Sequence, residues 1–288
     1  MQSKKNNMTG QLYVVATPIG NLGDISQRAK ETLEKVDLIA AEDTRHTGKL
    51  LAHLGIKKPM QSLHAHNERA RTEKLIDLLQ TGGSVALVSD AGTPLISDPG
   101  FPLIRAAQKA DIKIIPIPGP SAVIAALSVA GLPCDRFIFE GFLPAKSKAR
   151  LAQLKTLTTE TRTLVFYESP HRIEQTITDM LAVFGAEREA VIARELTKTF
   201  EQIKQASLAE LQAWLQDSEN HRRGEFVVLV KGREEKQPAT EPEINQLLKI
   251  LLEELPVKQA AKIAAKLSGE SKNKLYELAL NFRQKDDR

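Results

Sequence analysis

The sequence predicts an α/β protein with two α/β domains and a small helical module at its C-terminal end. Apolar runs typical of buried strands alternate with helical segments in the first part of the chain, which favours a mainly parallel sheet with helices on both faces. More strands and helices follow, and a charged segment then precedes a stretch that has only helical periodicity. With 288 residues, 42% of them hydrophobic, the chain can bury a sizeable core in more than one domain.

The first α/β domain is expected over residues 10–118. Its apolar runs predict strands at residues 12–16, 37–41, 84–89 and 112–117. The segments between them predict helices at residues 26–35, 44–54, 68–80 and 101–109. The sequence PGPSA, residues 118–122, marks the junction with the next domain because its prolines and glycine interrupt regular structure.

The second α/β domain is expected over residues 119–233, with shorter and less regular connections. A helix of small residues, 121–129, opens it and is ended by Gly131. Strands are predicted at residues 136–140, 163–167, 190–194, 199–204 and 226–230. Further helices are predicted at residues 148–157, 171–184 and 208–215.

A charged, proline-containing segment, residues 231–243, is typical of a linker and predicts a separate module over residues 243–288. Apolar residues recur there at helical spacing, with a turn at Ser268 and Gly269, so the module resembles a helix-turn-helix bundle; its helices are expected at residues 244–255, 257–267 and 273–282. Five lysines either meet RNA phosphates or form a solvated face: Lys258, Lys262, Lys266, Lys272 and Lys274. Four apolar residues are alternatively expected to pack onto the α/β core: Ile244, Leu247, Leu251 and Leu255.

Composition excludes several classes of protein. No apolar run approaches the roughly 20 residues of a membrane span, and the polar start MQSKKNNMTG lacks the apolar core of a signal peptide, so we expect a cytoplasmic protein with no membrane partner. The single cysteine, Cys134, excludes an intramolecular disulfide and is expected to pack in the interior. A net charge of +4 does not indicate nucleic acid without a local patch. His64 and His66 form the only close histidine pair and lack cysteine support, so no metal site is expected.

The segment LVSDAGTPLISDPG, residues 87–100, is a strand that stops abruptly in a tight polar loop. Small ligands bind at the carboxyl ends of strands in open α/β sheets. Gly92 and Gly100 permit close backbone approach to a ligand, and Pro94 and Pro99 fix the loop shape. The segment therefore predicts a rigid ligand-binding wall, although an ordinary turn between strand and helix has the same residue types.

Six further motifs occur in order along the chain: VVATPIGNLGDI (14–25), AAEDTRHT (40–47), PIPGPSA (116–122), FYESPHR (166–172), ARELTK (193–198) and GEFVVLV (224–230). Over residues 10–233 the chain thereby resembles the tetrapyrrole-methylase superfamily of S-adenosylmethionine-dependent enzymes. AEDTR, SDAGTPLISDPG and FYESPHR are similar to the ribosomal RNA small-subunit methyltransferase I family within it. This resemblance implies 2′-O-methylation of a decoding-centre cytidine in the 16S rRNA of the small subunit, a cofactor folded in a cleft between the domains, and a homodimer.

The resemblance also implies the residues that contact S-adenosylmethionine. The matching positions are Pro18, Asp90, Ala91, Gly92, Thr93, Ile96, Ser97, Ser121, Ala122, Tyr167, Leu196 and Glu225. Asp90 is expected to shape its loop or to bind the cofactor. The hydroxyl of Ser121 stands at a helix start and is expected either to bind the cofactor or to cap the helix.

The cluster AEDTRH supplies the candidate catalytic residues Glu42 and Arg45 at the end of a strand. We expect Arg45 to bind an RNA phosphate while a carboxylate or His46 accepts the proton of the 2′-hydroxyl. A structural interpretation stays open, because Thr44 is a plausible N-cap and acids before a helix are favoured by its dipole.

The cluster FYESPHR supplies the candidates Glu168 and Arg172, beside an aromatic pair that suits a splayed nucleotide. Ser169 and Pro170 also make a good helix start, so these residues and His171 are alternatively explained by a well-formed helix entrance. Lys198, the last candidate, is expected either to orient the hydroxyl or to lie on the surface.

Two other functions remain open. The superfamily includes methylases of tetrapyrroles and other small molecules, but AEDTR, FYESPHR and the helical module argue against that substrate class. A non-catalytic ribosome-assembly or RNA-binding protein could keep the same fold. The intact SDAGTP and PGPSA loops argue against that alternative, and a measurement of cofactor binding would distinguish it.

Overall fold

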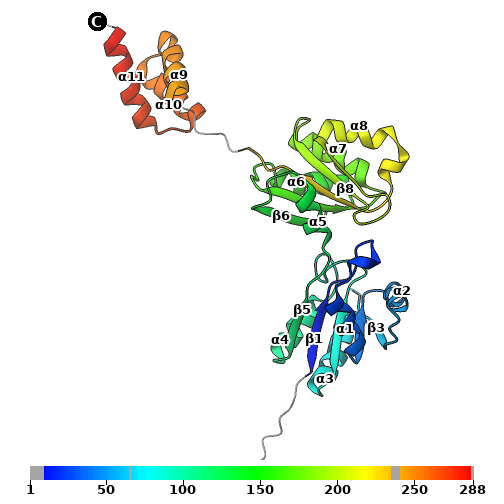
Figure 1. Ribbon diagram of the computed structural model, residues 1–288. Coiled ribbons are helices and arrows are strands. Elements are labelled where there is room, and N and C mark those ends of the chain that lie inside the picture. Colours follow the sequence, from blue (N-terminus) through cyan, green and yellow to red (C-terminus); the bar gives the residue numbers. More distant parts are fainter. Residues whose placement is uncertain (1–9, 65–66, 235–240, 287–288) are drawn as a thin grey trace, which may run out of the picture. The chain divides into compact units, whose positions relative to one another are not determined.

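The computed structural model describes residues 10–64, 67–234 and 241–286 (Figure 1). The chain forms two compact units, Met1–Arg233 and Glu234–Arg288. Among the described residues, no helix is long and apolar enough to cross a membrane.

The first sheet of the larger unit is parallel throughout, with strand order β3-β2-β4-β1-β5. Its strands are β1 (Gln11–Val15), β2 (Leu38–Ala41), β3 (Met60–Ser62), β4 (Ser84–Val88) and β5 (Lys113–Ile117). Four helices connect them: α1 (Gln27–Lys35), α2 (Thr44–Leu54), α3 (Glu68–Gln80) and α4 (Phe101–Lys109). The carboxyl ends of parallel strands meet at one edge, so the loops after β1, β2, β4 and β5 gather there.

Helices cover both faces of this sheet, and the alternating side chains of its strands are buried against them. Leu33 of α1 and Leu51 of α2 pack in one apolar cluster with Val15 and Ile39. In the cluster on the other face, α3 and α4 pack against β1 and β4 through Leu12, Leu75, Leu79, Val85, Leu87 and Leu103. The predicted parallel sheet with helices on both faces is therefore confirmed.

The second sheet is mixed, with order β6-β7-β10-β8-β9. Its strands are β6 (Phe137–Phe142), β7 (Thr163–Glu168), β8 (Glu189–Arg194), β9 (Gln202–Ser207) and β10 (Phe226–Val230). β6 and β7 are parallel, whereas β10 runs antiparallel to β7 and β8, and β9 antiparallel to β8. The beginning of β10 therefore lies at the same edge as the ends of β7 and β8.

Helices cover both faces of this sheet as well: α5 (Ala122–Val129), α6 (Ser147–Thr156), α7 (Ile173–Phe184) and α8 (Leu208–Asp217). α6, α7 and α8 share one apolar cluster, which includes Leu154, Ile177 and Leu211. α5 packs on the other face, in a cluster that also contains Ile19 and Leu196 from two loops. Ile19 follows β1 of the first sheet, so this cluster joins the two halves of the unit. Short 3-10 helices lie at Leu22–Asp24 and Glu219–Arg222.

Several sequence predictions are wrong in detail. β3 was not expected, because its three residues MQS carry no apolar pattern. β9 begins at Gln202, three residues later than predicted, because the chain before it forms a turn with a bond from Glu201 N to Lys198 O. α7 begins at Ile173 because residues 169–172 form a turn. Cys134 is exposed and does not pack in the interior.

The smaller unit consists of α9 (Glu241–Glu254), α10 (Val257–Ser268) and α11 (Lys272–Asp286) (Figure 1). Its helices enclose an apolar core of their own, formed by Ile244, Leu248, Ala261, Ala264, Leu275 and Ala279. Gly269 ends α10 in the left-handed conformation, with φ of 76°, as the predicted turn requires. Ile244, Leu247 and Leu251 pack within this unit, which accounts for their helical spacing without packing onto the α/β core.

The predicted linker is shorter than residues 231–243. At its beginning, the backbone N–H of Lys231 donates to the carbonyl of Glu189, and that of Arg233 donates to Glu160, so this stretch is held on the second sheet. At its end, residues 241–243 already belong to α9. Residues 235–240 of the predicted linker lie outside the described residues, as does His66 of the histidine pair.

Candidate functional site

A pocket of about 450 Å³ lies where the strand ends of the two sheets meet, within the range typical of small-molecule sites. Eleven of the twelve residues expected to contact a cofactor line it: Asp90, Ala91, Gly92, Thr93, Ile96, Ser97, Ser121, Ala122, Tyr167, Leu196 and Glu225. The twelfth, Pro18, is not among the lining residues, although its neighbour Ile19 is. The structure thus brings together motifs that are more than 200 residues apart, since Ile19 and Glu225 line the same space.

The loop after β4 forms one wall and is fixed by contacts with neighbouring loops. Gly92 forms an isolated antiparallel bridge with Thr17, with N–H···O distances of 2.9 and 3.0 Å between their backbones. The hydroxyl of Thr93 donates to the carbonyl of Pro120 at 3.0 Å. Gly92 has φ of 81°, and a Cβ there would lie 3.3 Å from Cγ2 of Ile19. This wall is therefore held in one conformation by the loops after β1 and β5.

Backbone strain is concentrated around the pocket. Five described residues other than glycine have positive φ, and four lie in or beside lining segments: Leu95, Ser97, Glu195 and Thr197. Such conformations cost of order 1–3 kcal/mol each and persist where the surrounding structure imposes them, most often at functional sites. One of these residues, Thr197, accepts a hydrogen bond at its side-chain hydroxyl from the backbone N–H of Asn21, at 3.0 Å. This concentration supports a ligand-binding role.

The hydroxyl of Ser121 is available at the start of α5. Ser121 is the N-cap residue, but within the described chain its side chain makes no capping hydrogen bond. Of the two roles predicted for it, capping is therefore not the one that the structure shows. Ala122 follows in the pocket wall, and Tyr167 lies beside the same helix, since it packs in one apolar cluster with Ala122 and Val123. Burial raises the pKa of Tyr167 to about 12, so it stays protonated.

Five carboxylates line the pocket and make it acidic, and three of them follow strands of the first sheet: Glu42, Asp90 and Asp98. The Asp90 carboxylate accepts from the backbone N–H of Asp43 at 3.1 Å, and the Glu42 carboxylate accepts from that of Asp90 at 3.4 Å. These two bonds tie the ends of β2 and β4 together. Burial, reinforced by the charge of Asp90, raises the pKa of Glu42. The site therefore favours a cationic ligand and holds a carboxylate that is more basic than usual.

The third carboxylate, Asp98, was missed by sequence reasoning. Burial, reinforced by the charges of Glu42 and Asp90, raises its pKa to about 6. Its sequence signal was present, because Asp98 follows Ser97 in the same loop, but the aspartate of an Asp-Pro-Gly turn is ordinarily a surface residue. Its proximity to Glu42 depends on the pairing of β2 with β4, which local sequence does not reveal.

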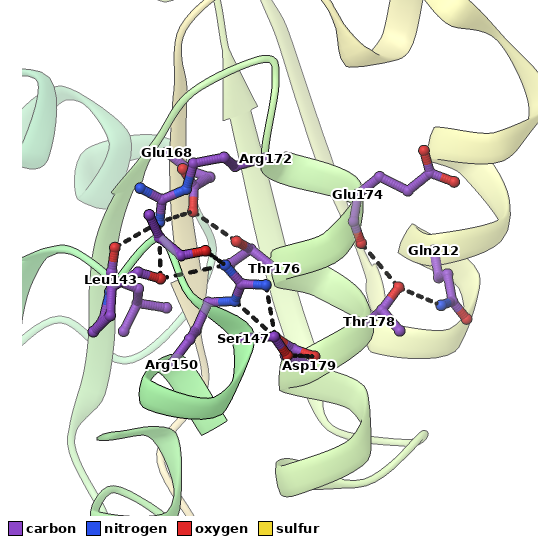
Figure 2. A network of polar contacts seen from close by, with 12 residues as sticks. Leu143, Ser147, Arg150, Glu168, Arg172, Glu174, Thr176, Thr178, Asp179 and Gln212 are labelled. Carbon is purple, nitrogen blue, oxygen red and sulfur yellow. Dashed lines mark hydrogen bonds and ion pairs between the residues drawn. The ribbon is translucent and has the colours of Figure 1, made fainter. Parts of the chain in front are cut away.

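Two of the five candidate catalytic residues, Glu42 and Glu168, line the pocket. Glu168 is buried, and its carboxylate accepts from the hydroxyl of Thr176 at 2.6 Å and from Arg172 at 3.2 Å (Figure 2). It also accepts from the backbone N–H of Ser169 at 2.8 Å. Arg172 also donates to the carbonyl of Leu143 at 2.5 Å. Both side chains are therefore engaged in hydrogen bonds with residues around the second sheet. The participation of Glu168 and Arg172 in RNA binding or catalysis stays a prediction.

Arg45 and Lys198 lie outside the lining of the pocket. The side chain of Arg45 is 89% exposed at the start of α2, where it forms an ion pair of 2.6 Å with Asp43. Asp43 also accepts from the backbone N–H of Arg45, so Asp43, rather than Thr44, is the N-cap of α2. The hydrogen bonds and charge of Arg45 lower the pKa of Asp43.

Lys198 joins two acidic residues at the edge of the pocket. Its ammonium group contacts Glu195 and the pocket residue Glu225, each at 2.9 Å. Burial alone would lower the pKa of Lys198, but the hydrogen bonds to these two carboxylates outweigh it and raise the pKa. Lys198 is therefore a fixed positive charge that orients Glu225 and cannot accept a proton at neutral pH.

Within residues 10–64, 67–234 and 241–286, no three His, Cys, Asp or Glu side chains are grouped so that they could hold a metal ion. His64, at the end of the loop after β3, has Asn67 as a neighbour, with 3.0 Å between its ring nitrogen and the amide nitrogen.

Comparisons with known proteins agree with this geometry. Residues 11–212 match the family described as Tetrapyrrole (Corrin/Porphyrin) Methylases, and residues 238–283 match the RsmI C-terminal HTH domain. Ribosomal RNA small subunit methyltransferase I of Escherichia coli O157:H7 is 54% identical over 275 residues, which cover 96% of this chain and 96% of the relative. Its namesake from Haemophilus influenzae is 52% identical over 281 residues, covering 97% of this chain and 99% of the relative.

Solved structures show the same fold at much lower identity. Uroporphyrin-III-C-methyltransferase from Thermus thermophilus has a TM-score of 0.53 and 20% identity, and covers 77% of this chain and 94% of its own. A cobalt precorrin-4 methyltransferase has a TM-score of 0.55 and 15% identity, with the same coverage of 77% and 94%. These likenesses confirm the predicted fold class, and the sequence matches confirm the resemblance. The chain belongs to the tetrapyrrole methylase family, in the branch of the ribosomal RNA small subunit methyltransferases I.

Proposed function

We propose that this protein uses S-adenosylmethionine to methylate the 2′-oxygen of a cytidine ribose in the 16S rRNA of the small ribosomal subunit. The observation that carries the proposal is the acidic pocket with rigid walls, in a chain about half identical to proteins named small-subunit rRNA methyltransferases. The motifs AEDTR and FYESPHR support a cytidine 2′-oxygen as the acceptor, since they carry the resemblance to the rRNA methyltransferases. Each motif contributes one lining residue to the pocket, Glu42 and Glu168.

The residues of the pocket fit S-adenosylmethionine. The cofactor is cationic at its sulfur and amino groups, and Glu42, Asp90 and Asp98 provide complementary negative charge. Apolar groups such as Ile19 and Leu196 suit the adenosine part. The hydroxyl of Ser121, which makes no capping hydrogen bond, can supply a further hydrogen bond to the cofactor. When bound, the cofactor supplies an electrophilic methyl group on its sulfonium.

The main task of the protein is to position the acceptor and remove its proton. A ribose hydroxyl is a poor nucleophile at neutral pH, so a base near it accelerates the attack. Glu42 and Asp98 are the pocket carboxylates with raised pKa, and each is therefore more basic than an exposed carboxylate. We propose that one of them accepts the 2′-hydroxyl proton. Rigid loops add to the rate by holding the reacting groups in line.

We propose that residues 10–118 and 119–233 are the two domains that enclose the cofactor, which agrees with one sheet from residues 11–117 and another from 137–230. The homodimer follows from the resemblance, and light scattering on the purified protein tests it. The cytoplasmic location follows from the composition. The solved structures of tetrapyrrole methyltransferases, with 15–20% identity, support the fold alone, and we propose no tetrapyrrole substrate for this protein.

The test is incubation of unmethylated 30S subunits with the protein and methyl-labelled S-adenosylmethionine, followed by mass spectrometry of the nucleosides. We expect label in 2′-O-methylcytidine. Label in another nucleoside would overturn the acceptor, and a protein that binds the cofactor by calorimetry but transfers no methyl group to rRNA would overturn the substrate class. Failure to bind the cofactor would favour a non-catalytic RNA-binding protein.

A further inference from the structure

Phe142, at the end of β6, is an aromatic residue of the pocket that has no assigned role. It lines the pocket, yet 54% of its surface is exposed. Its ring lies 5.5 Å from that of Tyr167 at an interplanar angle of 58°, and Tyr167 in turn meets Phe139 at 4.9 Å and 69°. The three rings form a cluster of which Phe142 is the exposed member. A large aromatic surface at the rim of a pocket points to a ligand with an aromatic face.

A β-bulge directs Phe142 toward this position. The register between β6 and β7 shifts between Phe139 and Gly141; pairing resumes with Gly141 opposite Phe166, and Phe142 then lies opposite Tyr167. Gly141 has φ of 66°, and a Cβ on it would lie 3.1 Å from the hydroxyl of Ser97, which lines the pocket. Bulges next to active sites re-aim side chains, and here the bulge sets Phe142 beside the loop that follows β4.

The segment directly after Phe142 is held by two arginines (Figure 2). Arg172 donates to the carbonyls of Leu143 and Pro144, at 2.5 and 3.5 Å. Arg150 donates to the carbonyls of Pro144 and Ala145, each at 3.3 Å. Residues 143–145 thus give three consecutive carbonyls to guanidinium groups.

Both arginines are fixed by buried carboxylates. Arg150 is 1% exposed and pairs with Asp179 at 2.7 Å, while Arg172 pairs with Glu168 at 3.2 Å. Buried ion pairs are expensive in desolvation and are better explained by the conformation that they specify than by net stability. In this fold they hold the backbone that follows Phe142, which reduces the conformational freedom that this segment loses when a ligand binds.

We propose that Phe142 is the platform on which the base of the target cytidine stacks, an inference that rests on the proposed function. The base and the 2′-oxygen are attached to adjacent ribose carbons, so a 2′-oxygen placed at the pocket brings its base to the pocket rim. Proteins that act on single-stranded RNA bind splayed bases by stacking them on aromatic side chains. The exposed fraction of Phe142, 54%, is larger than that of Ile96, another lining residue, at 39%. The ring is therefore accessible to a ligand other than the cofactor.

The test replaces Phe142 and measures RNA and cofactor separately. Loss of one stacked base in Phe142→Ala is expected to raise KM for 30S subunits, and Kd for a cytidine-containing RNA, by between about 5-fold and about 100-fold. Kd for S-adenosylmethionine, measured by calorimetry, should not change. Phe142→Trp should restore RNA affinity, whereas Phe142→Leu, which is apolar but has no ring, should behave like Phe142→Ala.

Phe137→Ala is the matched control, since Phe137 lies on the same strand, is 37% exposed and is not a lining residue. Its KM and both Kd values should match the unmodified protein. Weaker cofactor binding in Phe142→Ala with normal RNA affinity would overturn the proposal and assign the ring to the cofactor. RNA affinity that is equal in all Phe142 variants would also overturn it. If the unmodified protein methylates no cytidine, the proposed function fails, while RNA affinity still decides whether Phe142 stacks a base.

Discussion

At the scale of single residues, Gly92 shows why the pocket wall needs glycine. Its φ of 81° lies in the region that side chains with Cβ avoid, and its backbone is bridged to Thr17. In Gly92→Val, the new Cβ would lie 3.3 Å from Cγ2 of Ile19, and the branched side chain would occupy the lining of the pocket. We expect this variant to remain folded but to lose measurable binding of S-adenosylmethionine in calorimetry.

Gly55→Val is the matched control for this substitution. Gly55 ends α2 with a similar φ of 73°, but among the described residues a Cβ there would meet nothing within 4 Å. Both variants carry the strain of a left-handed residue, about 1–2 kcal/mol, so both should show a similarly lowered melting temperature. Equal loss of cofactor affinity in the two variants would contradict a specific role for Gly92 in the pocket.

Asp98 predicts a dependence of stability on pH. Its pKa is about 6 in the folded protein and 3.8 as an unperturbed group, so between about pH 4 and pH 6 the folded state binds more protons than the unfolded state. The contribution of Asp98 to the free energy of unfolding therefore falls as pH rises through this window. Asp98→Asn removes the buried charge, and its melting temperature relative to the unmodified protein should increase from pH 4 to pH 7.

Asp37→Asn should show the opposite sign. Hydrogen bonds from Ser84 lower the pKa of Asp37, so its stabilising contribution is present above pH 3.8 and is lost as pH falls through the lowered value. Parallel melting curves check both directions, followed from about pH 4 to pH 7 for Asp98→Asn and from about pH 5 down to about pH 2 for Asp37→Asn. A difference between Asp98→Asn and the unmodified protein that stays constant over its range would refute the raised pKa of Asp98.

At the scale of elements, α2 places Arg45 where it can meet RNA. Arg45 stands in the first turn, and its guanidinium is exposed although paired with Asp43. In Arg45→Ala we expect weaker RNA binding and a salt dependence that is smaller by about one phosphate contact, because each contact contributes roughly 0.7–0.9 to the slope of log K against log salt. Cofactor affinity should be nearly unchanged.

Arg162→Ala provides the control, because Arg162 forms the same kind of short-range ion pair with Glu160, at 2.8 Å. It directly precedes β7, whereas the pocket lies at the other end of that strand. RNA binding to this variant, measured by filter binding over a salt series, should match the unmodified protein. A similar loss in both variants would mean that Arg45 contributes only general positive charge.

Local sequence predicted the elements well where pattern and punctuation agreed. The bounds of α2, α3, α4 and β10 are those expected, because apolar spacing is clear and the ends coincide with residues such as Gly55 and Gly100. β9 was misplaced because it is an edge strand with mostly exposed side chains and therefore has little apolar signal. The mixed order of the second sheet depends on tertiary pairing, which no local pattern encodes.

The site was predictable where its residues stand directly after strands, as Asp90 and Ser121 do. Phe142 was missed because the predicted strand stopped at residue 140, and the bulge at Gly141 that extends β6 depends on its fit against Ser97. The sequence of FYESPHR indicated a nucleotide-binding or helix-entrance role for Arg172, but not that it contacts the carbonyl of Leu143, about 30 residues earlier in the chain. Such long-range polar contacts are what a single sequence conceals.

At the scale of the whole molecule, the chain consists of two units with separate apolar cores. The smaller unit buries Ile244 and Leu248 among its own helices, so the larger unit does not need them for its stability. On α10, Lys258, Lys262 and Lys266 are exposed and spaced by four residues, which places them on one helix face. A row of cations on a helical unit suits the phosphates of RNA, and favours a docking role for this unit.

The separate apolar cores predict that the larger unit folds without the smaller one. A chain that ends at Glu234 keeps both sheets, the bond from Arg233 to Glu160 and every lining residue of the pocket, so it should fold and bind S-adenosylmethionine with unchanged affinity. If the helical unit docks on the ribosomal subunit, the truncated chain should show a raised KM for 30S subunits with a smaller change in kcat. The full chain carrying Lys258→Gln, Lys262→Gln and Lys266→Gln, which keeps the helix propensity of α10, should raise KM in the same direction and lower the salt slope. Exposed lysines contribute little to stability, so its melting temperature should stay the same. A truncated chain that aggregates, together with a triple variant whose KM is normal, would instead show that the unit stabilises the protein and does not dock.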